Sequence, residues 1–364
     1  MPQWKSSAGL SAIKARARLN ADIRQFFAKR KVLEVDVPII AAATITDPFI
    51  ESLSTYCNGK IRFLQTSPEF FMKRLLASFN TANANANIDD CNIDSLNADG
   101  DAVTSPEHYT YPKEQDENHS IGAIYSLGKA FRNGESGRRH NPEFTLLEWY
   151  QPGFDDHQLM AEVVDLLRNV LPFKAVQSFS YRAVFQRYIE LDPHTASLEQ
   201  LQIVTQKNMH IEMNDDASYS HRDTWLDLLI SHVIEVKLAQ DFPEDFIFIY
   251  DYPATQAALA KITFDSSGEM IARRFEGFYR GIELCNGYWE LTDAQEQRQR
   301  FLSDQNKRQS LSLPQHPSDS LLLDALEQGL PSCAGVALGI DRLLMLQLEK
   351  NSLDEVISFP IKRA

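Results

Sequence analysis

The fold is decided by residues 124–150, IYSLGKAFRNGESGRRHNPEFTLLEWY. Two apolar runs flank a polar, glycine-containing loop, and this pattern predicts a β-hairpin. The loop gathers four basic side chains within nine residues: Arg132, Arg138, Arg139 and His140. Glu135 is the one acidic side chain among them. Because arginine pairs bidentately with phosphate oxygens, the loop is a candidate polyphosphate site, and a solvated basic turn is the alternative.

The returning strand of this hairpin carries an unusual face. Phe144, Leu146, Glu148 and Tyr150 alternate along it and are therefore expected on one side. A buried carboxylate is costly unless it is paired, so Glu148 is expected either to reach solvent or to meet a cation. Phe144, close to the arginines, suits a stacked purine. A strand with one solvated end would show the same pattern, and this alternative stays open.

Two further segments carry related chemistry. Residues 273–291, RRFEGFYRGIELCNGYWEL, place Glu283 and Glu290 seven positions apart, close to two arginines. These carboxylates either form surface ion pairs or hold Mg²⁺ together with substrate phosphates. Residues 335–342, GVALGIDR, predict a glycine-punctuated strand that leads into a helix with Arg342 in its first turns. Glycines let a ligand approach the backbone, and the start of a helix favours an anion.

Apolar spacing predicts the other elements of the fold. Helices are expected over residues 7–30, 156–171, 293–307, 318–328 and 340–348, and strands over residues 33–37, 246–251, 270–279 and 282–291. Several long strands follow one another without helices between them. This order favours an α+β fold with an antiparallel sheet over a doubly wound fold.

The composition limits the class of protein. The chain has 364 residues, 43% of them apolar, and a net charge of −14, which argues against a surface built for nucleic acid. No apolar run approaches the ~20 residues of a membrane helix, and the N-terminus lacks the apolar stretch of a signal peptide. The four cysteines (Cys57, Cys91, Cys285 and Cys333) are scattered, as expected of a reduced, cytoplasmic protein without a zinc site.

Residues 80–120 differ from the rest of the chain. They contain nine acidic residues and one lysine, a local charge of −8, so the remaining residues carry −6. They also lack Phe, Trp and any periodic apolar face, and such a segment cannot offset its ordering entropy by burial. We expect a disordered acidic insertion here, and a partner-binding loop is the alternative.

These segments together resemble class II aminoacyl-tRNA synthetases of the lysyl branch. The helix that leads to Val35-Asp36-Val37-Pro38 resembles motif 1, residues 131–144 resemble motif 2, and residues 335–342 resemble motif 3. Residues 66–76, TSPEFFMKRLL, and 281–293, GIELCNGYWELTD, match the same branch. The five motifs occur in the expected order and cover nearly the whole chain except the acidic insertion. The resemblance implies an antiparallel catalytic sheet flanked by helices, a homodimer formed through motif 1, and ATP and Mg²⁺ as cofactors.

Two features narrow the resemblance to the elongation factor P–(R)-β-lysine ligase family. Lysyl-tRNA synthetases carry an N-terminal anticodon-binding domain, whereas motif 1 begins here about 30 residues in, so we expect one domain over residues 1–364. Motif 3 has Ala337 where lysyl enzymes have glycine. The family implies an ATP-dependent ligase that activates β-lysine as an adenylate. It transfers β-lysine to a lysine of elongation factor P, and tRNA is not expected as a partner.

The resemblance assigns a role to each matching position. The nucleotide would be held by Arg132, Asn133, Gly134, Glu135, His140, Asn141, Phe144, Glu283, Leu284, Gly339 and Arg342. Arg132 and Arg342 would be catalytic, on the α- and γ-phosphates, and Phe144 would stack on adenine. The amino acid would be lined by Ser67, Pro68, Glu69, Glu148, Tyr150, Glu290 and Ala337. Mg²⁺ would be held by Glu283 and Glu290.

One position departs from the family pattern. Motif 2 usually has a glutamate two residues after its arginine, but here Gly134 occupies that position and Glu135 follows. Either Glu135 takes over the role or the backbone alone contacts adenine. Two other interpretations stay open: a truncated lysyl-tRNA synthetase-like enzyme with a tRNA or small-molecule acceptor, and a catalytically silent regulatory paralogue.

Overall fold

A central sheet organises the protein, seen in a computed structural model that describes residues 4–80, 120–209 and 221–364. Across those residues the strands follow the order β1 (Leu33–Glu34), β5 (Ile124–Phe131), β6 (Glu143–Pro152), β12 (Cys333–Gly339), β11 (Ile282–Trp289), β10 (Met270–Tyr279), β8 (Phe246–Pro253) and β7 (Val176–Ser180), and β9 (Ile262–Phe264) pairs with β10. Neighbouring strands are antiparallel except at the two edges, where β1–β5 and β7–β8 are parallel. This sheet confirms the expected α+β fold, including the predicted β5–β6 hairpin.

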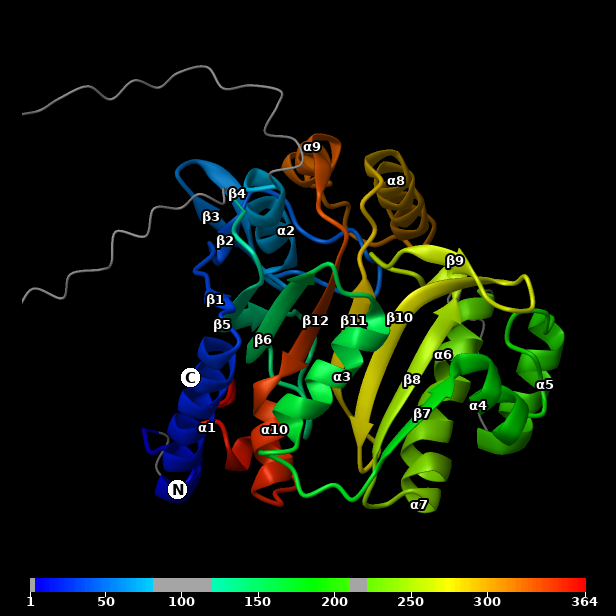
Figure 1. Ribbon diagram of the computed structural model, residues 1–364, viewed down its shortest axis with the longest axis horizontal. Coiled ribbons are helices and arrows are strands. Elements are labelled where there is room, and N and C mark those ends of the chain that lie inside the picture. The colour runs from blue at the N-terminus through cyan, green and yellow to red at the C-terminus, as the bar shows by residue number, and fades with distance from the viewer. Residues whose placement is uncertain (1–3, 81–119, 210–220) are drawn as a thin grey trace, which may run out of the picture.

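One face of the sheet is covered by α1 (Leu10–Lys29), α3 (Asp156–Leu167) and α10 (Ile340–Gln347); α3 crosses in front of it in Figure 1. Period-two alternation decides which residues meet these helices. Leu147 and Trp149 of β6 are fully buried in this layer, whereas Glu148 and Tyr150 face a cavity on the other side. The hydrophobic core therefore lies behind the sheet and leaves its front available for polar chemistry.

The other face is walled at one end by α2 (Glu69–Ser78), α8 (Ala294–Ser310) and α9 (Ser320–Gly329), at the top of Figure 1. Met72, Phe301 and Leu322 pack these helices against Tyr150 of the sheet. A small sheet of β2 (Ile40–Ala41), β4 (Lys60–Leu64) and β3 (Ser54–Cys57) leads the chain into α2. These elements enclose the cavity without filling it.

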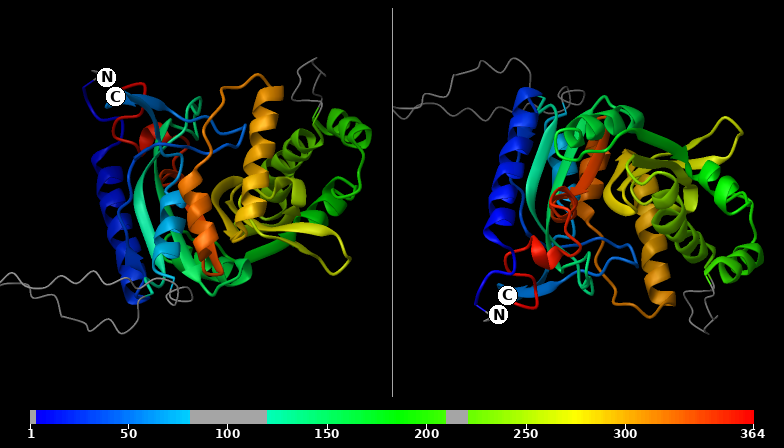
Figure 2. Two further views of the ribbon diagram at one scale, coloured as in Figure 1. Left: turned by 90° about the horizontal axis from the view of Figure 1, so that it is seen from above. Right: turned by 90° about the horizontal axis from the view of Figure 1, so that it is seen from below.

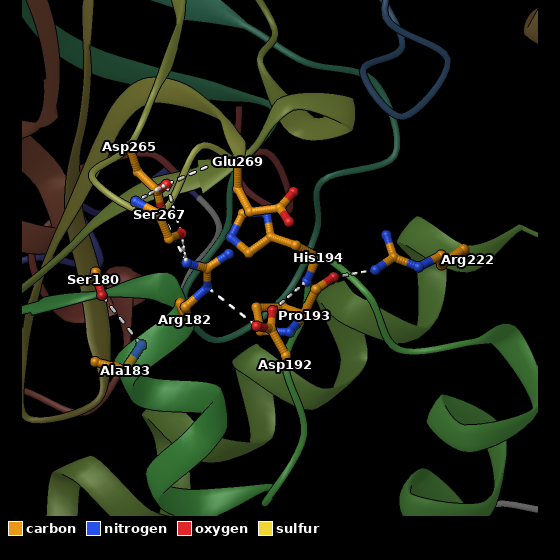
Figure 3. Close-up of polar contacts among 10 residues, drawn as sticks. All are labelled: Ser180, Arg182, Ala183, Asp192, Pro193, His194, Arg222, Asp265, Ser267 and Glu269. Carbon is orange, nitrogen blue, oxygen red and sulfur yellow. Dashed lines mark hydrogen bonds and ion pairs between the residues drawn. The ribbon is translucent and has the colours of Figure 1, made fainter.

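A helical lobe packs against the β7–β8 edge. It contains α4 (Tyr181–Tyr188), α5 (Leu198–Met209), α6 (Arg222–His232), the π-helix η3 (Val233–Leu238) and α7 (Ala239–Asp241). Arg182 ties this lobe to the β9–β10 hairpin, since its guanidinium lies 2.8 Å from Asp265 and 3.3 Å from Asp192 (Figure 3). The sequence patterns did not anticipate this lobe.

Most expected elements are present, with changed ends. The helix expected over residues 7–30 runs from Leu10 to Lys29, and the expected helix at 293–307 continues to Ser310. The strand expected over residues 33–37 is wrong in extent, because only Leu33 and Glu34 pair with the sheet. Leu33 is 51% exposed there, whereas Val35 is partly buried and Val37 is buried, so the predicted half-buried face is present only beyond the paired residues. Apart from its end residues, the predicted insertion at 80–120 lies outside the described residues.

The two ends of the described chain lie side by side (Figure 2). The backbone N–H of Ser7 donates to the carbonyl of Ser358, and Arg363 donates to the carbonyl of Lys5. No helix in the described ranges has the length and apolar character needed to span a bilayer. Short one-turn helices complete the fold: η4 (Ala254–Gln256) and η5 (Leu353–Glu355).

Candidate active site

Three neighbouring strands form the floor of a cavity of about 200 Å³. The register places Tyr150 of β6 beside Gly335 of β12, which in turn pairs with Tyr288 of β11. Two residues along, Glu148 lies beside Ala337, which pairs with Asn286. Because the central strand contributes only small side chains, the flanking side chains have room to converge above it. The predicted common face of β6 is thereby confirmed.

Arg132 and Phe144 face each other at the end of the cavity where the sequence analysis expects the nucleotide, which we call the nucleotide end. The Arg132 guanidinium lies 5.1 Å from the centre of the Phe144 ring, and Glu135 lies 3.6 Å from Arg132. Gly134 has a φ of 79°, a left-handed conformation that glycine adopts without strain, and it turns the loop so that Glu135 faces back to Arg132. Glu135, which follows the glycine that departs from the motif 2 pattern, therefore lies close to Arg132, the arginine of that motif.

Arg342, in the first turn of α10, joins the two halves of the nucleotide end. Its guanidinium donates to the carboxylate and the backbone carbonyl of Glu283, both at 3.1 Å. It also lies 2.7 Å from Nε2 of His140. Burial lowers the pKa of His140, and the charge of Arg342 lowers it further, so the neutral imidazole accepts this hydrogen bond. Arg132, His140 and Arg342 thus present basic groups to one volume, as a polyphosphate requires.

Asn141 holds the end of the motif 2 loop. Its side chain donates to the carbonyl of Glu143 at 2.6 Å and accepts from the N–H of Ile361 at 2.9 Å. It lines the cavity, but these contacts give it a clear role in fixing the loop. Asn133 instead accepts from the N–H of Gly134 and shapes the turn outside the lining.

Glu148 is a buried carboxylate at the opposite, amino-acid end. Tyr150 donates to its Oε1 at 2.7 Å, and its buried Oε2 makes no hydrogen bond to any residue the structure describes. Burial raises the pKa of Glu148 to about 8, and the charge of Glu69 adds to the rise. The hydrogen bond from Tyr150 and the nearby Ser67 hydroxyl act in the opposite direction on this pKa. Glu148 therefore neither reaches solvent nor meets a cation among the residues that the structure describes.

Lys73 of α2 lies beneath this end of the cavity, and sequence reasoning did not single it out. Its Nζ lies 2.7 Å from Glu69 Oε1 and 2.6 Å from Glu290 Oε2, and its side chain is 2% exposed. Burial alone would lower the pKa of Lys73, but the charges of Glu290 and Glu69 outweigh it and raise the pKa. Burial raises the pKa of Glu290 to about 8 despite the opposing charge of Lys73. The i,i+4 spacing of Glu69 and Lys73 is the signal that could have revealed the pair.

The Mg²⁺ prediction fits one of its two residues. Glu283 is half-exposed, lines the nucleotide end and offers the hard oxygen ligand that Mg²⁺ shares with substrate phosphates. Glu290 does not fit, because its carboxylate is buried and ion-paired to Lys73 at the other end. Within the described ranges, no group of three His, Cys, Asp or Glu side chains could hold a metal by itself. Phosphate oxygens would have to supply most of the ligands.

The structure also shows where Arg273 and Arg274, the two arginines that open residues 273–291, form their ion pairs. Arg273 pairs with Asp156 at 2.5 Å and Arg274 pairs with Glu276, and neither arginine lines the cavity. Asp156 is fully buried, and burial is the largest influence on the pKa of both Arg274 and Glu276. These are internal ion pairs of the fold, neither surface pairs nor phosphate ligands.

The structure brings together fifteen of the eighteen predicted site residues. The cavity is lined by Ser67, Glu69, Arg132, Glu135, His140, Asn141, Phe144, Glu148, Tyr150, Glu283, Leu284, Glu290, Ala337, Gly339 and Arg342. Pro68, Asn133 and Gly134 lie in the adjoining turns and do not line it. Arg139, which the sequence analysis named in the basic loop, also lines the cavity, whereas several other lining residues were not named, among them Asn286, Tyr288 and Gly335.

Comparison with known proteins gives one consistent result. The family model for class II tRNA synthetases (D, K and N) matches residues 118–363. An elongation factor P–(R)-β-lysine ligase of Histophilus somni (strain 2336) is 42% identical over 365 residues, covering 99% of this chain and 98% of the relative. The ligase of the same name from Salmonella paratyphi B is 41% identical over 368 residues, with the same coverage. The chain therefore belongs to the elongation factor P–(R)-β-lysine ligase family of the class II tRNA synthetases.

Proposed function

We propose that this enzyme activates (R)-β-lysine with ATP, as an aminoacyl-adenylate, and transfers it to a lysine side chain of elongation factor P. The observation that carries the proposal is the division of one cavity into a cationic end, with Arg132 and Arg342, and an end with three carboxylates. Both relatives are named for a ligase that acts on elongation factor P with (R)-β-lysine. The division of charge matches a triphosphate at one end and a diamino acid at the other.

The carboxylate end matches a diamino acid in charge. Glu69, Glu148 and Glu290 supply three carboxylates against the single ammonium of Lys73, a deficit of two positive charges when all are ionised. β-Lysine brings two ammonium groups, while its own carboxylate points to the nucleotide. Glu148 Oε2 and Glu290 Oε1 are buried, and neither has a hydrogen-bond partner in the described part of the chain. Buried acceptors without partners are costly, and two substrate ammonium groups would satisfy them.

The first half-reaction joins the two ends of the cavity. The amino-acid carboxylate attacks the α-phosphorus in line, forming the adenylate and releasing pyrophosphate. Arg132 stabilises charge on the α-phosphate, and Arg342, held by Glu283 and His140, stabilises the leaving pyrophosphate. Mg²⁺, held through Glu283 and phosphate oxygens, would neutralise further phosphate charge. No protein nucleophile is needed, so positioning and electrostatics supply the catalysis.

In the second half-reaction, the acceptor amine attacks the adenylate carbonyl and AMP leaves. The new bond is an amide, and the amine loses a proton to solvent or to the departing phosphate.

Within the residues described, Cys57, Cys285 and Cys333 form no disulfide, which is in keeping with the reduced cytoplasm that the sequence analysis expects.

We also propose a homodimer formed through motif 1. Leu10 and Ile13 on α1, Leu33 on β1, and Ile39 and Ile40 at β2 are all at least 41% exposed. Exposed apolar side chains gathered on adjoining elements are typical of an interface. Light scattering after size-exclusion chromatography tests this proposal: a monomer at micromolar concentration would overturn it.

Pyrophosphate exchange tests the first half of the function. The enzyme should exchange labelled pyrophosphate into ATP in the presence of (R)-β-lysine, and more slowly with lysine. Exchange with neither amino acid would exclude an activating enzyme and favour a silent paralogue.

The acceptor is tested separately. Labelled β-lysine should appear on elongation factor P and be lost when the acceptor lysine is replaced by arginine. Labelling of tRNA instead would favour the truncated synthetase-like enzyme.

A further inference from the structure

Resting on the proposed function, we infer that Lys73 is a positioning residue for the amino-acid substrate. It fixes the carboxylate of Glu290 by one oxygen, so that the other oxygen is presented to a substrate ammonium. Lys73 does not line the cavity, and it acts through the two glutamates that do.

The contacts of Lys73 join two separate elements. Glu69 lies one turn earlier on α2, whereas Glu290 follows the end of β11. The Nζ atom is within 2.7 Å of one oxygen of each carboxylate, so a single ammonium links the helix wall to the floor. Both the lysine and Glu290 are at most 2% exposed, so water cannot replace this contact.

The orientation of Glu290 follows from this link. Lys73 pairs with Oε2, which leaves Oε1 directed over Gly335, where an added Cβ would collide with it. Oε1 is buried, and the described residues offer it no hydrogen bond. A carboxylate with one oxygen anchored and one unused is a preformed acceptor, and an ammonium group of the substrate is the matching donor.

Glu148 of β6 is held in a similar way. Tyr150 anchors its Oε1 at 2.7 Å and leaves the buried Oε2 without a hydrogen bond in the described structure. Each carboxylate is thus held by one protein donor and keeps one oxygen for the substrate. Lys73 does for Glu290 what Tyr150 does for Glu148.

Lys73→Met tests this role, because methionine is also unbranched, is only one atom shorter than lysine and carries no charge. Affinity for (R)-β-lysine, measured by titration calorimetry, should fall about 10- to 100-fold, the loss expected for one hydrogen bond to a charged group. Affinity for ATP should stay within about twofold, because the nucleotide end is untouched. Lys73→Arg should recover much of the β-lysine affinity. Arg74→Met is the matched control: Arg74 is next on α2, lies over the Phe71 ring and lines no part of the cavity.

The double variant Lys73→Met/Glu69→Gln distinguishes a positioning role of Lys73 from a purely structural one. Removing one carboxylate with the ammonium relieves the uncompensated buried charge, so the melting temperature should recover. If Lys73 positions Glu290, β-lysine affinity in this variant stays well below that of Glu69→Gln alone. Recovery of affinity together with stability would overturn the inference, as would an unchanged β-lysine affinity in Lys73→Met.

Binding is measured without the ligase reaction, so the two proposals fail separately. If β-lysine binding depends on Lys73 but the wild-type enzyme modifies no acceptor, only the proposed function is contradicted. A ligase-active enzyme with unaltered binding in Lys73→Met contradicts only the inference. A wild-type enzyme that binds neither β-lysine nor lysine contradicts the inference directly.

Discussion

The Tyr150 hydroxyl donates a 2.7 Å hydrogen bond to Oε1 of Glu148, the residue two positions earlier on the same face of β6. Tyr150→Phe removes this donor and keeps the ring that packs in the α2–α9 cluster. Affinity for the amino acid should fall about 10-fold, since Glu148 loses the one hydrogen bond that orients it. The Michaelis constants for the amino acid and for ATP in pyrophosphate exchange test this. An equal rise in both would indicate a general disturbance of the site.

The raised pKa of Glu148 predicts that amino-acid affinity depends on pH. Burial raises this pKa to about 8, so the carboxyl is mostly protonated at pH 7 without substrate. An ammonium group favours the ionised form, so binding lowers the pKa and releases a proton. Affinity should therefore rise between pH 6 and pH 8, and calorimetry in buffers of different ionisation enthalpy should detect the proton. Glu148→Gln should bind more weakly and lose part of this pH dependence, and the rest should come from Glu290, whose pKa burial also raises to about 8.

The same shift predicts how stability varies with pH without ligand. A carboxyl whose folded pKa lies above its unfolded value binds more protons when folded. Its contribution to stability is therefore lost as pH rises from about 4.5 to about 8. The melting temperature of wild type should fall over this interval more than that of Glu148→Gln. A steeper fall in the variant would contradict the assignment.

Arg342 should be essential to the nucleotide half-reaction. It contacts Glu283 and His140 and, in the reaction proposed above, stabilises the leaving pyrophosphate. Arg342→Ala should lower kcat/KM for pyrophosphate exchange about 10²- to 10³-fold, the usual loss of one charge-stabilising donor. Arg138→Gln is the matched control, because Arg138 belongs to the same basic loop but is exposed and lines no cavity. Comparable losses in the two variants would point to general attraction of ATP.

Substitutions at two glycines of β12 should affect the binding of the two substrates separately. A Cβ at Gly335 would collide with the Tyr150 ring and the Glu290 carboxylate, so Gly335→Ala should abolish detectable amino-acid binding and spare ATP. At Gly339 the nearest atom to an added Cβ is the Leu284 carbonyl oxygen at 4.0 Å. Gly339→Ala should therefore fold normally and raise the Michaelis constant for ATP alone. If Gly335→Ala impaired only ATP binding and Gly339→Ala impaired only amino-acid binding, the two substrates would occupy the opposite ends of the cavity from those proposed.

Ala337 lies between these glycines, beside Glu148 and Asn286. We expect its methyl group to help select a β- over an α-amino acid. Ala337→Gly should therefore raise exchange with lysine relative to (R)-β-lysine. A difference of one methyl group corresponds to about a 10-fold change in this ratio at most. An unchanged preference would remove Ala337 from the determinants of specificity.

The sequence predicted the β5–β6 hairpin and the face of β6 because alternation is a local property. Alternation alone could not place Glu148 and Glu290 at the same cavity, because that depends on β12 being inserted between β6 and β11; only the family resemblance implied it. Lys73 was missed for a related reason. An i,i+4 Glu–Lys pair is ordinary on an exposed helix, and only the packing of α2 over the sheet buries it. The strand over residues 33–37 was overestimated, because the chain leaves the edge of the sheet after Glu34, although β5 continues to Phe131.

The placement of Gly335, Ala337 and Gly339 along one strand also has a consequence for engineering. These positions point the same way and pass in turn from the amino-acid end to the nucleotide end. A library limited to position 337, with Gly335 kept, would vary the size and shape of the accepted side chain. It would leave every arginine of the nucleotide end intact, so new amino acids could be screened without rebuilding the chemistry of activation.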